Sequence, residues 1–81
     1  MDDIVLRVRP AANGWVVESA GRLEALRFHS GARAEAQAYA LAEAMAYVGK
    51  DARVVVHDRG DRLVGSKRYF AQDPTRNDPA L

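Results

Sequence analysis

The sequence predicts a small α+β domain in which an antiparallel sheet of short strands carries one alanine-rich helix on one face. Three observations predict this class: apolar and polar residues alternate near the N-terminus, alanine fills the middle of the chain, and a valine-rich run follows. The 81 residues suffice for one hydrophobic core. We therefore expect a single domain over residues 1–70 and a flexible tail over residues 71–81, where proline and polar residues are frequent.

The N-terminal segment predicts a β-hairpin. Apolar and polar residues alternate over residues 3–9, as in a half-buried strand, and Pro10 is expected to end that strand because proline cannot donate to a sheet ladder. Asn13 and Gly14 accept positive φ at little cost. Residues 15–19 should therefore return antiparallel to the first strand.

A third strand is expected over residues 23–29. Leu26 and Phe28 alternate there with polar residues, which is again the pattern of a half-buried strand. Glu24 has the same parity as these apolar residues, so the paired part of this strand should begin at or after Glu24.

The middle of the chain predicts the helix. Alanine occupies every even position from Ala32 to Ala46, and alanine is the best helix former. Ser30 is the expected N-cap and Gly49 the expected C-terminal cap. The face toward the sheet is expected to hold Ala34, Ala38, Leu41, Ala42, Met45 and Val48. The far side is expected to hold Glu35, Tyr39, Glu43 and Lys50.

A second hairpin is expected after the helix. Residues 53–57 are rich in valine and predict a strand, residues 58–61 predict a turn, and residues 62–64 predict a short returning strand that Gly65 and Ser66 end. The turn contains Arg59-Gly60-Asp61, the tripeptide that integrins read. Glycine and aspartate are ordinary turn formers, so we interpret the tripeptide as part of the turn.

Taken together, these segments resemble a family of short bacterial domains known as domain of unknown function 2188. The resemblance rests on Val8-Arg9-Pro10, on Gly14-Trp15-Val16-Val17, on Ala34-Glu35-Ala36 and on the run from Val54 to Arg59, and it covers nearly the whole chain apart from the tail. The last turn differs, since such domains usually have Asp-Gly where this chain has Gly60-Asp61. The resemblance implies a strand, strand, helix, strand, strand layout and a bacterial source, and it implies no assigned activity.

Composition and motifs argue against an enzyme, a metal site and a cofactor. The chain has no cysteine, which excludes disulfides and thiolate ligands. Only His29 and His57 titrate near neutral pH, and no spacing supports a catalytic dyad, a metal site built on His57, Asp58 and Asp61, or a glycine-rich phosphate loop. The acidic start and the absence of a long apolar run predict a cytoplasmic protein that does not enter membranes.

The sharpest functional signal is a basic sheet face. If one strand face packs on the helix, it holds Ile4, Leu6, Val8, Leu26, Phe28, Val54, Val56 and Leu63. The opposite face then holds Arg7, Arg9, Arg27, His29, Arg53, His57 and Arg62. Glu18 opposes their charge, and Val5, Val16, Val55 and Val64 lie between them. Trp15 has the parity of Val17 and is expected in the core beneath the helix.

These features favour a non-enzymatic interaction module that acts through protein partners or through self-association as a homodimer. Self-association has two candidate surfaces, which are the valines of the basic face and the ridge formed by Ala36, Ala40 and Ala44. The alternative is nucleic-acid binding, in which the arginines of the sheet face would neutralise phosphates. Against this alternative, the expected strand alternation places no aromatic ring on that face.

Overall fold

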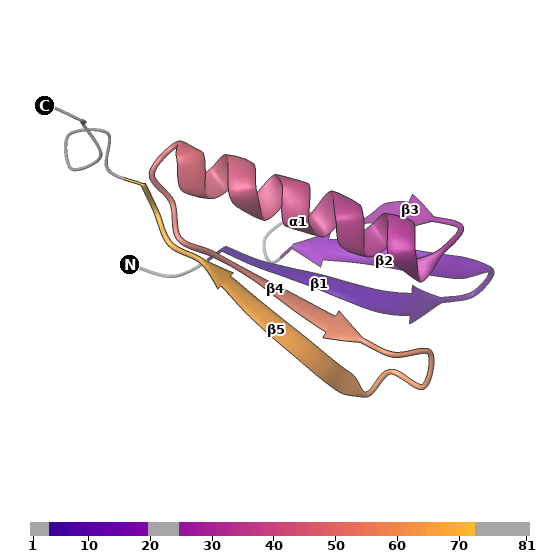
Figure 1. Ribbon diagram of the computed structural model, residues 1–81. Coiled ribbons are helices and arrows are strands. Elements are labelled where there is room, and N and C mark those ends of the chain that lie inside the picture. Colours follow the sequence, from indigo (N-terminus) through magenta and orange to yellow (C-terminus); the bar gives the residue numbers. More distant parts are fainter. Residues whose placement is uncertain (1–3, 20–24, 73–81) are drawn as a thin grey trace, which may run out of the picture.

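A computed structural model describes residues 4–19 and 25–72 of the chain. Five strands form one sheet, and a single helix lies across one face of it (Figure 1). In chain order the elements are β1 Ile4–Ala11, β2 Gly14–Ser19, β3 Leu26–Phe28, α1 Gly31–Tyr47, β4 Ala52–His57 and β5 Leu63–Tyr69. The sheet order is β3-β2-β1-β4-β5. The predicted α+β class, with one helix packed on one sheet face, is confirmed.

The sheet is mixed, whereas an antiparallel sheet was expected. β1 pairs with β4 in parallel, from Ile4 beside Ala52 to Val8 beside Val56, and the other neighbouring pairs are antiparallel. The helix carries the chain back along the sheet between β3 and β4, as crossover connections to a parallel strand do. The carboxyl ends of β1 and β4 consequently meet at the same end of the sheet.

The first hairpin is confirmed, but Pro10 does not end its first strand. β1 continues to Ala11, and Pro10 lies opposite Trp15 of β2. The N–H of Ile4 points toward β4, where it donates to Asp51, so alternation directs the nitrogen of Pro10 to the same side. β4 pairs with β1 only as far as Val8. The missing N–H of the proline therefore costs no ladder bond.

The third strand is shorter than expected and begins at Leu26. Residues 20–24, where its start was placed, lie outside the described residues. β2 and β3 approach so closely that a Cβ on Gly14 would come within 2.4 Å of the carbonyl oxygen of Phe28. Asn13 adopts the expected positive φ, at 66°. Only glycine fits at position 14, because a side chain there would collide with backbone.

The helix begins at its expected cap, since the Oγ of Ser30 accepts the backbone N–H of Arg33 at 3.1 Å. Gly49 follows the helix at a φ of 92°, in the left-handed region favoured by glycine. The face on the sheet consists of alanines, with Leu41 and Met45 partly buried beside them. The fully covered helix positions are Ala34, Ala38, Ala42 and Ala46.

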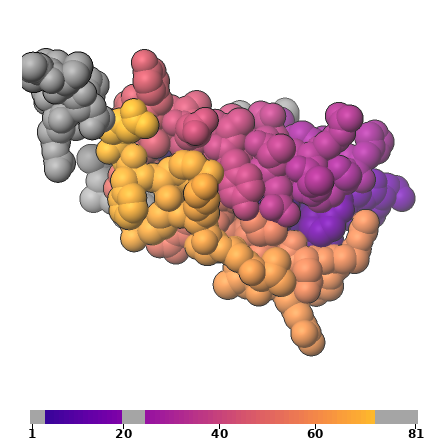
Figure 2. Space-filling view, in the orientation of Figure 1, coloured from indigo at the N-terminus to yellow at the C-terminus, as the bar shows by residue number. Residues whose placement is uncertain are grey.

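Two helix residues do not lie where they were expected. Val48 is 67% exposed and does not belong to the core. It is the C-cap residue of the helix and belongs to an exposed stretch over residues 47–50. Tyr39 was expected on the far side, yet its ring lies 6.4 Å from that of Tyr69 on β5 and packs against the core. In the space-filling view (Figure 2) the orange and yellow atoms of the C-terminal strand lie against the helix.

β5 is longer than the strand predicted there, and Gly65 and Ser66 do not end it. It pairs with β4 along the whole of β4, from Leu63 beside His57 to Tyr69 beside Ala52. A register shift at the turn end places Leu63 opposite His57 and leaves it 63% exposed, although it was expected in the core. Past the strand, the N–H of Gln72 donates to Ala46 at the end of α1.

Candidate binding face: the arginine-rich open side of the sheet

The sheet face opposite α1 gathers arginines from four of the five strands, β1, β3, β4 and β5. Register places Arg7 beside Glu18 and Val55, and it places Arg9 and Arg27 on either side of Val16. On the other half of the sheet Arg53 lies beside Arg68. We define the open face by the arginines that this register brings to one side: Arg7, Arg9, Arg27, Arg53 and Arg68.

Valines lie between these arginines as expected, and two of them are almost covered. Val16 and Val55 are each 7% exposed although no helix of the described part of the chain packs on this side. Their neighbours in the register are arginines and Ser66. Long arginine stems cover apolar surface while their guanidinium groups stay in water. The open face therefore consists of buried apolar side chains beneath a layer of guanidinium groups.

Two carboxylates partly neutralise one arginine of this face. Nη2 of Arg9 lies 2.7 Å from Oδ2 of Asp61, and its Nε donates to Oδ1 at 3.1 Å. Nη1 of Arg9 also donates to Glu18 at 3.4 Å. The hydrogen bond from Arg9 holds the pKa of Asp61 below its ordinary value, and the bond to Asp61 raises the pKa of Arg9. Glu18 was predicted to oppose the charge of the basic face. The ion pair between Asp61 and Arg9 was not predicted.

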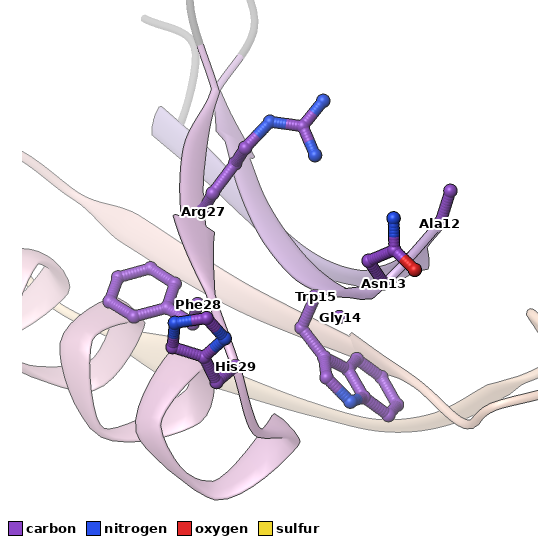
Figure 3. A pocket seen from close by; sticks show the side chains of 7 residues that line it. All are labelled: Ala12, Asn13, Gly14, Trp15, Arg27, Phe28 and His29. Carbon is purple, nitrogen blue, oxygen red and sulfur yellow. The ribbon is translucent and has the colours of Figure 1, made fainter.

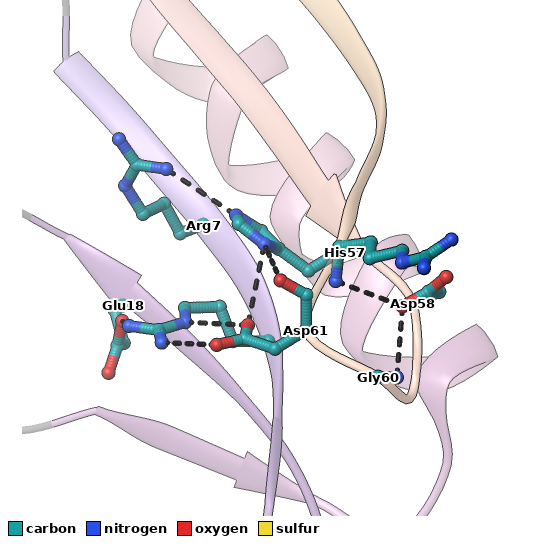
Figure 4. Close-up of polar contacts among 8 residues, drawn as sticks. Arg7, Glu18, His57, Asp58, Gly60 and Asp61 are labelled. Carbon is teal, nitrogen blue, oxygen red and sulfur yellow. Dashed lines mark hydrogen bonds and ion pairs between the residues drawn. The ribbon is translucent and has the colours of Figure 1, made fainter.

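His57 lies between Arg7 and Asp61 at the edge of the same cluster (Figure 4). Its Nδ1 is 3.2 Å from the backbone oxygen of Asp61, and its Nε2 is 3.5 Å from Nη1 of Arg7. Asp58, which was weighed as a metal ligand with these residues, instead accepts the N–H groups of Gly60 and Arg62 within the turn. Across residues 4–19 and 25–72, no group of three or more histidines, cysteines or acids is placed to hold a metal ion.

The turn that supplies Asp61 has a specific backbone requirement. The N–H of Asp61 donates to the carbonyl of Asp58, and Asp61 adopts a φ of 64°. This left-handed position is the one that glycine usually fills in such a turn, and aspartate is among the few other residues that tolerate it. An aspartate at position 61 therefore tolerates this backbone conformation and places a carboxylate beside Arg9, which a glycine there could not supply.

Two residues predicted for this face lie at its margins. Arg62 closes the turn opposite Asp58 and does not pair beside His57. His29 follows the end of β3 and lines a shallow hollow of about 240 Å³ together with Trp15, Phe28 and Arg27 (Figure 3). The sequence alternation could not place either residue, because each lies just beyond the end of its strand.

Trp15 lies on the helix side, as its parity predicted. It is partly buried against the core, and the helix starts so close to it that a Cβ on Gly31 would lie 3.1 Å from the indole. The guanidinium of Arg59 lies over the ring, 5.2 Å from its centroid. Trp15 is thereby occupied by contacts within the domain.

One aromatic residue does lie on the side of the open face. Phe70 follows β5 two positions after Arg68, and the guanidinium of Arg68 lies 5.3 Å from its ring centroid. Phe70 is 66% exposed. Sequence reasoning missed both residues because it ended the strand at Gly65 and Ser66. The alternation of Ser66 and Arg68 with Lys67 and Tyr69 was the signal that could have revealed them.

Comparison with known proteins adds no relative. The chain matches no family model, no curated protein and no solved structure. The resemblance to domain of unknown function 2188, and the bacterial source that it implies, therefore stay predictions. In the part of the chain that the structure describes, the helix is too short and too polar to cross a membrane.

Proposed function

We propose that this domain is a non-enzymatic interaction module that acts in the cytoplasm and uses its open face to bind an acidic segment of a partner protein. One observation carries the proposal: four strands bring five arginines to a single sheet face, above two nearly covered valines, and within residues 4–19 and 25–72 no helix lies on this face. Guanidinium groups above apolar side chains are complementary to a partner that has carboxylates beside apolar side chains.

The kind of cation supports a protein partner. Each basic residue of the open face apart from His57 is an arginine, whereas the described lysines, Lys50 and Lys67, lie at the helix end and on the helix side of β5. Arginine is enriched in protein interfaces and lysine is depleted there. Its planar guanidinium binds a carboxylate through two parallel hydrogen bonds. Arg9 and Asp61 already form such a pair within the domain.

The same charges disfavour self-association through this face. Two copies placed face to face would bring together five arginines from each, and the carboxylates of Glu18 and Asp61 both already contact Arg9. Like charges held close together in an interface oppose binding. The valines of the open face, which were one expected route to a homodimer, are therefore better suited to an acidic partner than to a second copy.

The proposal predicts that reversing charge on the open face abolishes binding of an acidic peptide. Arg7 and Arg27 are both exposed, so Arg7→Glu with Arg27→Glu should leave the fold intact. An NMR titration with a ten-residue peptide of alternating glutamate and valine should move the amide signals of β1, β2 and β4. We expect the double variant to lose at least about tenfold in affinity.

A matched control separates the open face from net charge. Arg33→Glu with Lys50→Glu changes the net charge equally at two exposed positions on and after the helix. This control should bind the peptide nearly as well as the original chain. Equal loss in both double variants, or signals that move only on the helix, would contradict the proposed face.

A second candidate function is single-stranded nucleic-acid binding, and the contact between Arg68 and Phe70 favours it. An exposed ring beside a guanidinium is the unit on which nucleobases stack, and Arg53 adds a second positive charge beside Arg68. Only this one ring accompanies the arginines of the open face among the described residues, and Glu18 and Asp61 would repel phosphates near the middle of that face.

An oligothymidylate of the same net charge as the peptide, titrated in a parallel experiment, tests this candidate. Tighter binding of the oligonucleotide, lost in Phe70→Ala, would support it over the protein partner.

A further inference from the structure

Arg9 binds a carboxylate of its own chain on the open face. Its Nε donates to Oδ1 of Asp61 at 3.1 Å and its Nη2 donates to Oδ2 at 2.7 Å, so both carboxylate oxygens bind one edge of the guanidinium (Figure 4). Nη1 of Arg9 donates to Glu18 at 3.4 Å and leaves that edge to Asp61. Two parallel N–H donors are the arrangement with which arginine recognises carboxylates. The domain thus contains a carboxylate-binding site whose occupant comes from its own turn.

Arg9 lies beside the arginines on which the proposed binding of an acidic segment depends. It is two residues from Arg7 along β1, and Val16 lies between it and Arg27 in the register of the sheet. Neighbouring strands are about 4.8 Å apart, so the backbones of Arg9 and Arg27 are roughly 10 Å apart across β2. An acidic segment that contacts both Arg7 and Arg27 therefore brings its carboxylates within reach of Arg9.

The ion pair is exposed, so another carboxylate can replace Asp61. The side chains of Arg9 and Asp61 are 40% and 44% exposed. Exposed ion pairs contribute little to stability, because water solvates the separated charges well. The carboxylate has one further neighbour in His57, whose Nδ1 lies 3.4 Å from Oδ1. A carboxylate from another molecule can consequently compete for Nε and Nη2 of Arg9 at small cost.

The turn keeps its shape without this carboxylate. The N–H of Asp61 donates to the carbonyl of Asp58, and the N–H of Asp58 donates to the carbonyl of Arg62, each at 2.8 Å. The side chain of Asp58 accepts the N–H groups of Gly60 and Arg62. These bonds do not involve the carboxylate of Asp61. Its side chain can therefore rotate away from Arg9 while the backbone of the turn stays in place.

We propose that Arg9 binds a carboxylate of the partner's acidic segment through Nε and Nη2, and that this carboxylate displaces Asp61, which acts as an internal competitor. This inference rests on the proposed function and names the position at which the segment is selected. Asp61 is tethered beside Arg9, so a lone carboxylate in solution competes poorly with it. A segment already held at Arg7 and Arg27 presents its own carboxylate at a high local concentration. The ion pair thereby favours segments with several carboxylates over isolated anions.

Removing the competitor should strengthen binding of the ten-residue peptide of alternating glutamate and valine. Asp61→Asn and Asp61→Gly both tolerate the left-handed backbone at this position, and both lack the carboxylate. Each variant should bind the peptide about two- to fivefold more tightly, which is the range expected for an exposed ion pair.

A matched control accounts for the change in net charge. Glu43→Gln removes one negative charge from an exposed helix position and should alter the affinity by less than about 1.5-fold. Unchanged affinity in both Asp61 variants, or an equal gain in Glu43→Gln, would overturn the competition.

The same change combined with Arg9→Gln separates competition from repulsion. Asp61 repels the glutamates of the peptide whether or not Arg9 is present, whereas competition for Nε and Nη2 requires Arg9. We therefore expect Asp61→Asn to strengthen binding less when Arg9 has been replaced. Equal gains with and without Arg9 would contradict the displacement of Asp61.

The carboxyl carbon of Asp61 gives a direct readout in the original chain. Its NMR signal should shift as the peptide saturates the domain, because Asp61 loses two hydrogen bonds to Arg9. A signal that stays in place while the amide signals of β1 and β2 move would overturn the displacement and leave the proposed function standing. Failure of the original chain and of both Asp61 variants to bind the peptide would instead reject the proposed function itself.

Discussion

Asp61 combines a backbone role with an electrostatic one. It occupies the left-handed position of the β4–β5 turn and binds the guanidinium of Arg9 through both carboxylate oxygens. The two residues are 52 positions apart in the sequence. They meet because β1 and β4 run parallel, so that both strands end at the same end of the sheet. An antiparallel pairing of these strands would have left Arg9 far from the turn.

The pH dependence of stability should reveal this ion pair. Arg9 lowers the pKa of Asp61 in the folded protein, so the pair stabilises the fold above the ordinary aspartate pKa of 3.8, and that stability is lost as pH falls through the folded value. Asp61→Asn retains tolerance of the left-handed backbone and removes the charge. Urea unfolding should show a small loss of stability in the variant near pH 6 that disappears near pH 2. A loss that stays constant with pH would contradict the role of the carboxylate.

At the scale of elements, the helix packs closely on the sheet because its buried face is built from alanine. Ala34, Ala38, Ala42 and Ala46 are fully covered and recur at every fourth position. No larger side chain separates the helix backbone from the strands along this row. The spacing between helix and sheet is therefore fixed by methyl groups, and it leaves little room for larger side chains.

Enlarging this row should destabilise the domain, whereas enlarging the opposite face should not. Ala38→Leu inserts a branched side chain into a covered position and should cost about 1 to 3 kcal/mol, or more if the helix cannot move. Ala40→Leu makes the same change at an exposed helix position and should be nearly neutral. Denaturant unfolding compares the two. Equal effects would contradict the close packing of the alanine row.

Local sequence signals predicted most of these elements, and the exceptions have physical causes. The Asn13 turn, the Ser30 cap and the alanine helix depend on neighbouring residues, so the sequence reveals them. The parallel pairing of β1 and β4 depends on the path of the whole chain. Gly65 indicated a strand end, yet it lies within β5 opposite Val56, where a Cβ would meet no heavy atom within 4 Å. Pairing with β4 outweighs the low strand propensity of glycine at this position.

In the candidate site, too, local signals predicted some residues, and those that depend on distant parts of the chain were missed. Alternation predicted the arginines of β1, β3 and β4 on the open face, because each lies well inside a strand. It missed Arg68 and Phe70, which depended on the true length of β5. It also missed the neutralisation of Arg9 by Asp61, which no pattern within either strand contains. The positive charge predicted for a sheet face from strand alternation is therefore an upper limit on its actual charge, because carboxylates from other elements can pair with its arginines.

At the scale of the whole molecule, the core is small. Val8 and Val54 are the largest fully buried side chains among the described residues. A chain of 81 residues is expected to have a free energy of unfolding of about 4 to 12 kcal/mol. Removing even one branched side chain from such a core should take away a sizeable part of that stability.

Val54 is the position at which this expectation is tested most directly. It lies on the helix side of β4, beside Leu6 of β1 and Lys67 of β5, and none of its surface is exposed. Val54→Ala removes two buried carbon atoms from the side chain and leaves a cavity, so it should lower the free energy of unfolding by about 2 to 3 kcal/mol. Val48→Ala makes the same chemical change at a residue that is 67% exposed and should cost less than about 0.5 kcal/mol. Urea midpoints measured by circular dichroism compare the two variants, and similar midpoints would mean that stability does not depend on the valine core.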